Sequence, residues 1–139
     1  MRRLLTTALA AATTTLVTTL CAAAAPLPGV APGAASLHLT RAHVSEGGRI
    51  VSAGHVHLDC PADASAPHPY AREACRDVRG AAGDLDRLPG TTFAFCADEP
   101  GTTVTVTADG VYEGRPVRWT RTYVDDCVRA LATGQVFDF

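Results

Sequence analysis

Four cysteines carry the clearest chemical pattern in this 139-residue sequence, an earlier pair at Cys60 and Cys75 and a later pair at Cys96 and Cys127. A small exported domain uses an even number of cysteines as disulfide bridges rather than as nucleophiles. Four cysteines allow three pairings, and we expect each to bond to its nearest neighbour in the sequence. Closing the shorter loop would stabilise the fold by about 3 kcal/mol in the chain-entropy model. A bridge at Cys96 would also hold the loop that follows it, and we expect the function to lie there.

Histidines suggest a second kind of chemistry, that of a metal site. His55 and His57 lie two residues apart on one face of a predicted strand, and such a pair can bind zinc. His38, His43 and His68 lie elsewhere in the sequence, and no Cys-x-x-Cys motif or helical histidine pair supports a site. We therefore interpret the pair as the exposed polar face of a strand and expect no metal.

Acidic residues near the later cysteines offer a third possibility. Asp98 and Glu99 would lie near Asp125 and Asp126 if the later cysteines are bonded to each other. Such a cluster allows a weak calcium site, because calcium prefers carboxylate oxygens. A solvated loop rim is the simpler interpretation, and we adopt it.

Catalysis has no support among these residues. The paired carboxylates Asp84 and Asp86 fall at a predicted helix end and are expected on the surface. The serines are few, and none lies in a nucleophile-elbow motif: Ser36, Ser45, Ser52 and Ser65. We expect neither an enzyme nor a cofactor.

Residues 1–24 predict a signal peptide. Arg2 and Arg3 supply the positive start, an apolar stretch runs to Leu20, and the alanines beyond it offer a small-residue cleavage site. An uncleaved membrane anchor is the alternative, but the stretch is short and diluted by threonines. A lipid-attached Cys21 is disfavoured, because the leucine before it is too large for that processing. We expect a secreted, extracellular protein with an even number of cysteines.

The mature chain has the size of one domain and a mildly acidic charge. Loss of Arg2 and Arg3 leaves ten arginines against 14 acidic residues, a formal net charge of −4. This balance argues against a nucleic acid partner. The chain contains no lysine, and its single methionine is Met1. Residues 25–36, rich in proline, glycine and alanine, predict a flexible arm before the domain.

Hydrophobic periodicity predicts the elements that must position these residues. Strict alternation indicates strands, most cleanly in Thr103–Thr107, and a spacing of three to four residues indicates helices. Asp109-Gly110 predicts a turn or a bulge. Together the elements predict an α+β domain with one antiparallel sheet and two helices. The strands are expected at residues 36–40, 54–60, 103–107, 117–123 and 135–139, and the helices at 72–82 and 125–131.

Three aromatic residues could belong either to the core or to a contact between subunits. Trp119 and Tyr123 share one face of a predicted strand, and Tyr112 precedes that strand. Arg121 lies on the same face, so one end of this face must reach solvent or a partner.

Several motifs together resemble the Streptomyces subtilisin inhibitor family. The likeness runs from about Leu37 to Phe139, so that residues 37–139 would form one subtilisin-inhibitor-like domain. No single motif is diagnostic, and their combination carries the resemblance. The motifs are Val56-His57-Leu58-Asp59-Cys60-Pro61, His68-Pro69, Ala74-Cys75, Gly83-Asp84-Leu85, Asp109-Gly110-Val111-Tyr112-Glu113-Gly114, Cys127 and Val136-Phe137-Asp138-Phe139.

The resemblance implies a secreted inhibitor of serine proteases, built as a homodimer on a five-stranded antiparallel sheet with two short helices and two disulfides. Such inhibitors present a substrate-like loop that the protease binds tightly and cleaves very slowly. The family places its third cysteine two residues before the residue that enters the protease specificity pocket, which puts Asp98-Glu99 at the reactive bond. The rest of the reactive loop would be Cys96, Ala97, Pro100 and Gly101, with Asp125 as its support.

The reactive position departs from the family's pattern. Family members usually carry methionine, lysine or arginine where this sequence has Asp98, and none of these lies between Thr91 and Arg115. The segment from Cys96 to Asp109 is one residue longer, and Asp125 replaces an asparagine, whose amide hydrogens aspartate lacks.

Two hypotheses follow from the acidic position. An unpaired charge is costly in the apolar pocket of a subtilisin. The partner is therefore expected to be an extracellular serine protease, either subtilisin-like or specific for acidic residues. Alternatively, the chain is an inhibitor-fold secreted binding module that has lost strong inhibition. No membrane partner is expected.

Overall fold

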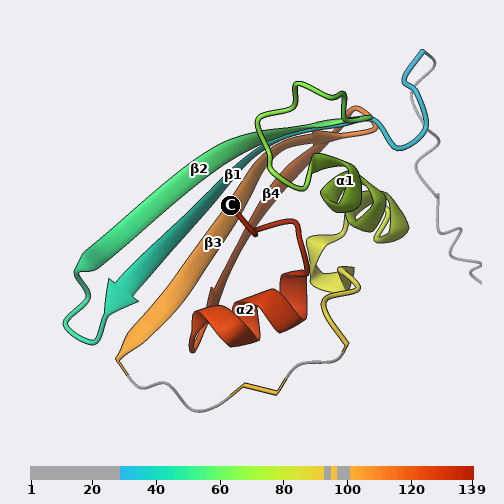
Figure 1. Ribbon diagram of the computed structural model, residues 1–139. Coiled ribbons are helices and arrows are strands. Elements are labelled where there is room, and N and C mark those ends of the chain that lie inside the picture. Colours follow the sequence, from blue (N-terminus) through green and yellow to red (C-terminus); the bar gives the residue numbers. More distant parts are fainter. Residues whose placement is uncertain (1–28, 93–94, 97–100) are drawn as a thin grey trace, which may run out of the picture.

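The computed structural model describes residues 29–92, 95–96 and 101–139, which form a four-stranded antiparallel sheet with helices on one face (Figure 1). The predicted signal peptide, residues 1–24, lies outside the described residues. The strand order is β2-β1-β3-β4, with β1 Ala35–Ser45, β2 Ile50–Cys60, β3 Thr102–Tyr112 and β4 Arg115–Tyr123. The helices are α1 Ala71–Gly80, the 3₁₀ helix η1 Leu85–Arg87, and α2 Asp126–Thr133.

The predicted α+β class is confirmed, and the four strands are longer than predicted. β1 begins at Ala35, so the last two residues of the predicted arm belong to the sheet. Just before it, the backbone N–H of Gly33 donates to Glu113 Oε1 at 2.6 Å, which ties the chain to the β3–β4 turn. Across the described ranges, no helix is long and apolar enough to cross a membrane.

The prediction of a fifth strand is wrong, because the C-terminal residues 135–139 contain turns and no strand. Val136 N donates to Thr133 O at 3.3 Å, and Asp138 N donates to Gln135 O at 3.2 Å, so this backbone bonds locally. Side chains of a strand alternate between its two faces, whereas Val136 and the adjacent Phe137 are both fully buried. The C-terminal tail therefore belongs to the core between the sheet and α2 rather than to the sheet.

The prediction of a turn or bulge at Asp109-Gly110 is also wrong, because β3 continues through it. Gly110 pairs with Leu37 on one side and with Val117 on the other. A Cβ at this position would lie 2.1 Å from the carbonyl oxygen of Ser36, which explains a glycine inside a strand. The chain reverses instead at Glu113-Gly114, where φ is 49° and 75°, as a two-residue type I′ hairpin turn requires.

The core lies between the sheet and the helices, and the three ambiguous aromatic residues face it. Tyr112 is buried, and Trp119 stacks on Phe137 with 5.5 Å between the ring centroids. Tyr123 packs against the same cluster. Of the two alternatives left open by the sequence, the structure supports the core for these three residues. The fully buried aliphatic residues of this core include Leu37, Leu39, Leu58, Val78, Val104 and Val106.

Arg121 lies on the face of β4 that is turned toward the helices, and its side chain contacts η1. It forms an ion pair with Asp86, and Trp119 Nε1 donates to the same carboxylate at 2.9 Å. The bond from Trp119 and then the contacts of Arg121 hold the pKa of Asp86 below its ordinary value. Asp86 of η1 thus joins this helix to the helix-facing side of β4.

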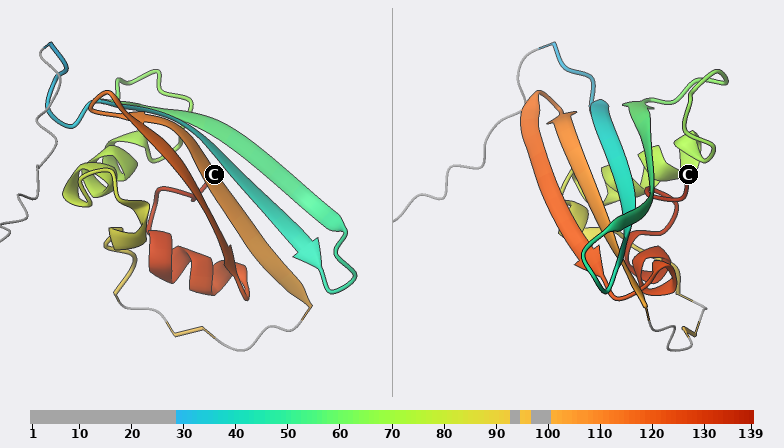
Figure 2. Two further views of the ribbon diagram at one scale, coloured as in Figure 1. Left: turned by 180° about the vertical axis from the view of Figure 1, so that it is seen from behind. Right: turned by 90° about the vertical axis from the view of Figure 1, so that its left-hand side faces the viewer.

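The other face of the sheet is not covered by any element in the described ranges (Figure 2). Cross-strand hydroxyl pairs join its strands: Thr40 with Thr107 at 2.7 Å, and Thr105 with Thr122 at 2.8 Å. The remaining side chains of this outer face include Ser36, His38, Ala42, Ala53, His55, His57, Asp59, Asp109 and Arg118. The outer face is thus open and mostly polar, with Val111 as an exposed apolar residue beside Ser36.

The earlier disulfide and a buried histidine close the loop between β2 and α1. Cys60 is bonded to Cys75, as predicted. His68 Nδ1 accepts a hydrogen bond from Tyr70 N at 3.1 Å, and Nε2 donates to Val136 O at 3.0 Å. Nδ1 can accept only when the ring is neutral. Burial lowers the pKa of His68, against the bond to Val136 and the charge of Asp138, which raise it.

His68 predicts that the fold loses stability on mild acidification. The unfolded chain has a histidine pKa of about 6.5, and the folded pKa lies below it. Between the two values the unfolded state binds more protons, so the free energy of unfolding falls as the pH decreases through this window. Urea denaturation at several pH values between 7.5 and 5 measures this fall. We expect the variant His68→Gln to be less stable at pH 7.5 but to show a shallower decrease. An equal decrease in both proteins would contradict the assignment.

Candidate functional site

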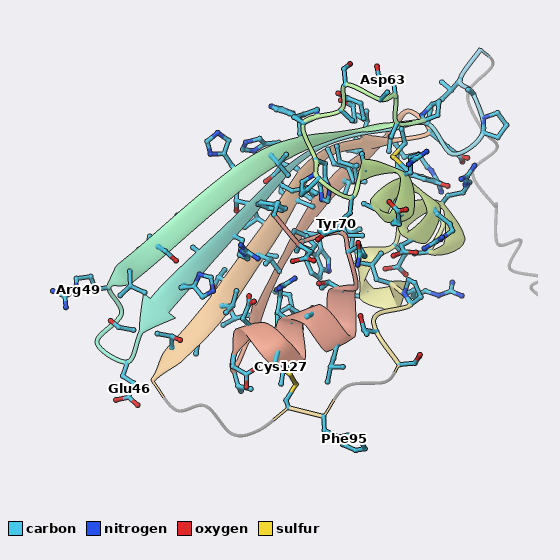
Figure 3. All side chains as sticks on the ribbon, viewed as in Figure 1. Glu46, Arg49, Asp63, Tyr70, Phe95 and Cys127 are labelled. Carbon is cyan, nitrogen blue, oxygen red and sulfur yellow. A yellow bond between two sulfur atoms is a disulfide. The ribbon has the colours of Figure 1, made fainter. Side chains whose placement is uncertain are left out.

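The later disulfide fixes the start of the predicted reactive loop to helix α2 (Figure 3). Cys96 is bonded to Cys127 with 5.7 Å between the Cα atoms, as the nearest-neighbour pairing predicts. Cys127 lies in the first turn of α2. Residues 97–100, which include the predicted reactive bond Asp98-Glu99, lie outside the described residues. The structure therefore places the two ends of the predicted loop, Cys96 and Gly101.

A second contact ties the same segment to α2 one turn further on. Thr91 N donates to Leu131 O at 2.9 Å. Gly90 has a φ of 62°, and a Cβ there would lie 1.9 Å from the same carbonyl oxygen, so glycine permits this close approach. Residues 127 and 131 are four apart and lie on one face of the helix. The segment from Gly90 to Cys96 is thus held to α2 near both of its ends.

Phe95 is fully exposed beside this bridge. Its side chain points away from the body of the protein (Figure 3), with a relative exposure of 102%. A single exposed apolar residue is common on protein surfaces, but this one directly precedes the cysteine that anchors the loop. A partner that docks on the loop and covers this ring would gain about 1.5–3 kcal/mol from its burial.

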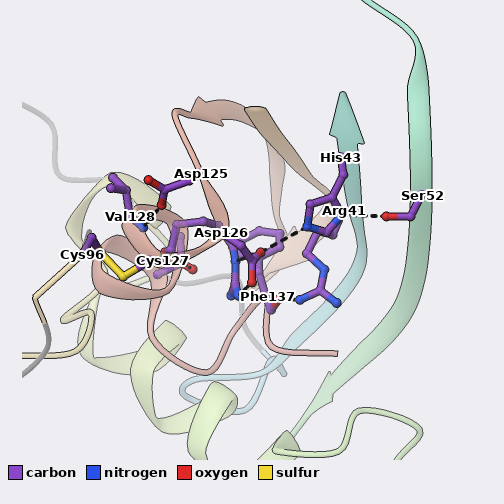
Figure 4. A network of polar contacts seen from close by, with 11 residues as sticks. Arg41, His43, Ser52, Cys96, Asp125, Asp126, Cys127, Val128 and Phe137 are labelled. Atoms are coloured by element: carbon purple, nitrogen blue, oxygen red, sulfur yellow. Dashed lines mark hydrogen bonds and ion pairs between the residues drawn. A yellow bond between two sulfur atoms is a disulfide. The ribbon is translucent and has the colours of Figure 1, made fainter. Parts of the chain in front are cut away.

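Asp125 caps the end of α2 that carries the bridge (Figure 4). Its Oδ1 accepts a hydrogen bond from Val128 N at 2.6 Å, and the residue is buried. A carboxylate oxygen of Asp125 also lies within 4.8 Å of the sulfur atoms of Cys96 and Cys127. Aspartate is a favourable N-cap, and its charge complements the positive end of the helix dipole. The cap therefore fixes the helical turn from which Cys127 reaches the loop.

Helix α2 is joined to the sheet through Asp126. Its two carboxylate oxygens accept hydrogen bonds from Arg129 at 3.0 and 2.9 Å, and His43 Nε2 of β1 lies 3.5 Å away. His43 Nδ1 shares a hydrogen bond of 2.8 Å with Ser52 of β2 (Figure 4). Burial alone would raise the pKa of Asp126, but the bonds and charge of Arg129, with the charges of Arg41 and His43, hold it below its ordinary value. The carboxylate of Asp126 therefore stays ionised into the acidic range. Its contact with His43 of β1 is retained there as well.

The chain of contacts Ser52–His43–Asp126 matches a catalytic triad only in composition. In a triad the carboxylate is dedicated to the imidazole, and the serine is presented to substrate beside an oxyanion hole. Here Arg129 engages both oxygens of Asp126, and Ser52 lies within strand β2 rather than on a strand-to-helix elbow. These residues connect α2 to two strands, which is a structural role.

Arg129 is the buried centre of these contacts, with 2% of its surface exposed. Its Nη1 donates to Phe137 O at 3.1 Å, and Arg41 of β1 donates to the same carbonyl at 3.3 Å. The guanidinium thus joins α2 to the C-terminal tail. Sequence reasoning missed Arg129, although its spacing of three from Asp126 on a predicted helix was the available signal.

Replacing Arg129 by methionine is expected to destabilise the fold by about 2–4 kcal/mol, because removing one partner of a buried ion pair leaves the other groups unpaired. Asp126 is 46% exposed and can be solvated, which keeps the effect below the upper end of the usual range. Urea denaturation measures this loss of stability. Arg49→Met is the control, since Arg49 is exposed in the turn between β1 and β2. A loss below about 1 kcal/mol in the Arg129 variant would contradict the assigned role.

The ligand-type residues at the base of the loop do not make a metal site. Cys96, Asp125 and Cys127 come together there, but both sulfur atoms are in the disulfide and offer no thiolate. Asp125 is bonded to the α2 backbone and Asp126 to Arg129, so their carboxylates already have partners. The possibility of a calcium site therefore gains no support from these two residues.

Comparison with known proteins identifies the family. A family model described as subtilisin inhibitor-like matches residues 33–125. Subtilisin inhibitor-like protein 7 of Streptomyces ambofaciens is 38% identical over 104 residues, which cover 75% of this chain and 94% of that protein. Plasminostreptin of Streptomyces antifibrinolyticus is 37% identical over 104 residues, with the same coverage.

A solved structure agrees with this result. Sermetstatin of Streptomyces caespitosus, in complex with subtilisin of Bacillus licheniformis, is 31% identical and superposes with a TM-score of 0.57. The match covers 77% of this chain and all of sermetstatin. The chain therefore belongs to the subtilisin inhibitor-like family, whose members are protease inhibitors and not enzymes.

Proposed function

We propose that this protein is a secreted inhibitor of serine endopeptidases that presents a substrate-like loop, with Asp98-Glu99 as its reactive bond. The observation that carries the proposal is the Cys96–Cys127 bridge, which joins the loop to α2 beside the fully exposed Phe95. Family membership supports the class of partner, since sermetstatin is solved in complex with subtilisin.

The inhibition would rest on a loop that is held in its bound shape before it meets the protease. Fixing the backbone of a free substrate costs about 1–2 kcal/mol per residue. A loop tied to α2 through Thr91 and Cys96 has lost part of that freedom on folding, so it loses less on docking. Asp125 would support this arrangement by capping the turn of α2 that carries Cys127.

The same bridge would slow release of the loop after cleavage. Cys96 precedes the proposed reactive bond, and Cys127 follows it in the sequence. Cutting Asp98-Glu99 would therefore leave both fragments joined through the disulfide. The new termini would stay close to the protease and to each other, which disfavours dissociation.

The target that we propose is a protease whose specificity pocket contains basic or hydrogen-bonding groups. Asp98 would enter this pocket as the residue before the reactive bond. In a large apolar pocket an unpaired carboxylate loses several kcal/mol of solvation. An arginine or lysine in the pocket would offset that loss through charge-assisted hydrogen bonds.

We further propose that the protein acts outside the cell as a homodimer. The leader pattern of residues 1–24 supports export, and two disulfides suit an oxidising compartment. The open outer face of the sheet is the surface available for a second copy. Sedimentation of the mature protein at micromolar concentration measures the oligomeric state.

A titration of the folded mature protein against serine proteases of different pocket chemistry tests the inhibitory function. The panel contains a subtilisin, a trypsin-like protease and a protease that cuts after glutamate or aspartate. We expect stoichiometric loss of activity in the acidic-residue-specific protease and weak inhibition of subtilisin. Full activity of every protease would contradict the proposal and favour a binding module that has lost strong inhibition.

A further inference from the structure

Three histidines gather on the outer face of the sheet, although the sequence placed only two of them together. His38 of β1 is the direct cross-strand partner of His57 of β2, and His55 lies two residues away on the same face of β2. The ring centroids of His38 and His57 are 4.9 Å apart, and those of His38 and His55 are 5.7 Å apart. The expectation that His38 lies apart from this pair is therefore wrong, because the β1–β2 register brings it alongside.

The outer face carries few charges around these rings. By strand register and alternation, its only charged side chains within the four described strands are Asp59, Asp109 and Arg118. Asp59 accepts a hydrogen bond from Ser36 at 2.7 Å, and Asp109 lies 3.7 Å from Arg118, so both carboxylates already have partners. The rest of the face toward the β1–β2 turn is uncharged and consists mainly of small side chains: Thr40, Ala42, Ala53, Thr105, Thr107, Thr120 and Thr122.

A sheet face of this composition suits a second copy of the same chain. The central part of a protein–protein interface is depleted in charged residues. A twofold contact brings the same patch of both copies together, so a charge near its centre would meet a like charge. Threonine hydroxyls can both donate and accept hydrogen bonds, which lets a row of them pair with an identical row. The three histidines are therefore the groups that decide whether this face is charged.

We propose that the homodimer forms through this outer face and dissociates on mild acidification, because His38, His55 and His57 become charged within the contact. This inference rests on the homodimer proposed above and adds its control by pH. A neutral imidazole can be buried with hydrogen bonds, whereas an imidazolium loses solvation on burial. Protonation would also place like charges side by side, both within each cluster and between the two copies.

Proton linkage gives the direction of the effect. A solvated histidine has an ordinary pKa of about 6.5, and burial in a contact lowers that value. The separated chains therefore bind more protons than the dimer does, and the dimer weakens as the pH falls. At pH 5.5 each ring that must stay neutral weakens the dimer about tenfold, so two such rings weaken it about a hundredfold. Asp59 and Asp109 flank the rings in the separated chain as well, so they do not reverse this direction.

Sedimentation of the intact mature protein at pH 7.5 and pH 5.5 tests the inference. We expect a dimer at pH 7.5 and a dissociation constant about a hundredfold higher at pH 5.5. The triple variant His38→Gln, His55→Gln, His57→Gln should stay dimeric at both pH values. His43→Gln is the matched control and should dissociate like the wild type, because His43 lies beside Asp126 on the helix-facing side. Circular dichroism at pH 5.5 checks that each protein is folded.

A permanent charge provides a second, independent variant. His38→Arg places a cation at the centre of the cluster, and it should weaken the dimer at pH 7.5 about as much as acid weakens the wild-type dimer. Dimerisation of this variant as tight as that of the wild type would overturn the inference, as would the same pH dependence in the wild type and the triple variant.

The experiment also separates this inference from the proposals on which it rests. A wild type that is equally dimeric at both pH values would overturn the pH control and leave the homodimer in place. A wild type that is monomeric at pH 7.5 would overturn both. None of these measurements depends on protease inhibition, so the inhibitory function can hold or fail independently.

Discussion

Removing the loop bridge by the double replacement Cys96→Ser and Cys127→Ser is expected to convert a slowly cleaved inhibitor into an ordinary substrate. Residues 97–100 would then have to be ordered at the moment of docking, at about 1 kcal/mol each. A total near 3–4 kcal/mol weakens inhibition by about two to three orders of magnitude. Inhibition constants, together with the rate of cleavage by the same protease, measure both changes.

The other disulfide supplies the control for this experiment. Cys60→Ser with Cys75→Ser removes a bridge that closes the loop before α1, away from the reactive loop. Both double variants should lose about 2–5 kcal/mol of stability. Only the Cys96/Cys127 variant should lose inhibition at a temperature where both remain folded. Equal inhibition by the two variants would show that the bridge at Cys96 does not preorganise the loop.

Replacing Asp98 by methionine is expected to create strong inhibition of subtilisin. The change removes the carboxylate that loses several kcal/mol of solvation in an apolar pocket and replaces it with a flexible apolar side chain. We expect an improvement of about two to three orders of magnitude in the inhibition constant for subtilisin. The same variant should lose inhibition of an acidic-residue-specific protease.

Asp63 supplies the matched control for the Asp98 replacement. It is exposed in the loop between β2 and α1 (Figure 3), so Asp63→Met makes the same chemical change away from the reactive loop. Its inhibition of either protease should equal that of the wild type. A folded Asp98→Met protein that leaves subtilisin as active as the wild type does would remove Asp98 from the specificity position.

The regular elements of the fold were predictable because their patterns are local. Alternation of threonine and valine located β3, and the apolar spacing around Val78 located α1. The two pairings of the cysteines followed from proximity in the sequence, and both are confirmed. Local patterns underestimated strand length, however, because residues at strand ends are only partly buried and do not alternate clearly in sequence.

The errors arose where long-range contacts decide the structure. Val136 and Phe137 favour a strand by type, yet both are buried in the core, where Phe137 stacks on Trp119 and its carbonyl accepts from Arg129. Gly110 favours a turn by residue type, yet it lies within the sheet, where the missing Cβ makes room for the carbonyl oxygen of Ser36. Neither contact can be deduced from neighbouring residues in the sequence.

In the candidate site, too, some features were predictable from the sequence and others depend on long-range contacts. The family resemblance implied a role for Cys96 and Asp125 at the loop, and the structure brings them together at the first turn of α2. The second tie, between Thr91 and Leu131, was not predicted, because a backbone hydrogen bond leaves no side-chain signal beyond the conformation that Gly90 allows. The histidine pair His38/His57 likewise depends on strand register, which sequence periodicity alone does not fix.

The most direct test of the claim that the protease binds a disulfide-held loop is to identify the bond that a target protease cuts. The mature protein is incubated with a catalytic amount of the inhibited protease, and its mass is measured with and without reductant. We predict slow cleavage of the single bond Asp98-Glu99. Without reductant the cleaved product should remain one species, because the disulfide between Cys96 and Cys127 joins its two fragments. With reductant the two fragments should separate. Rapid cleavage at several sites, or a first cut outside residues 95–101, would contradict the account.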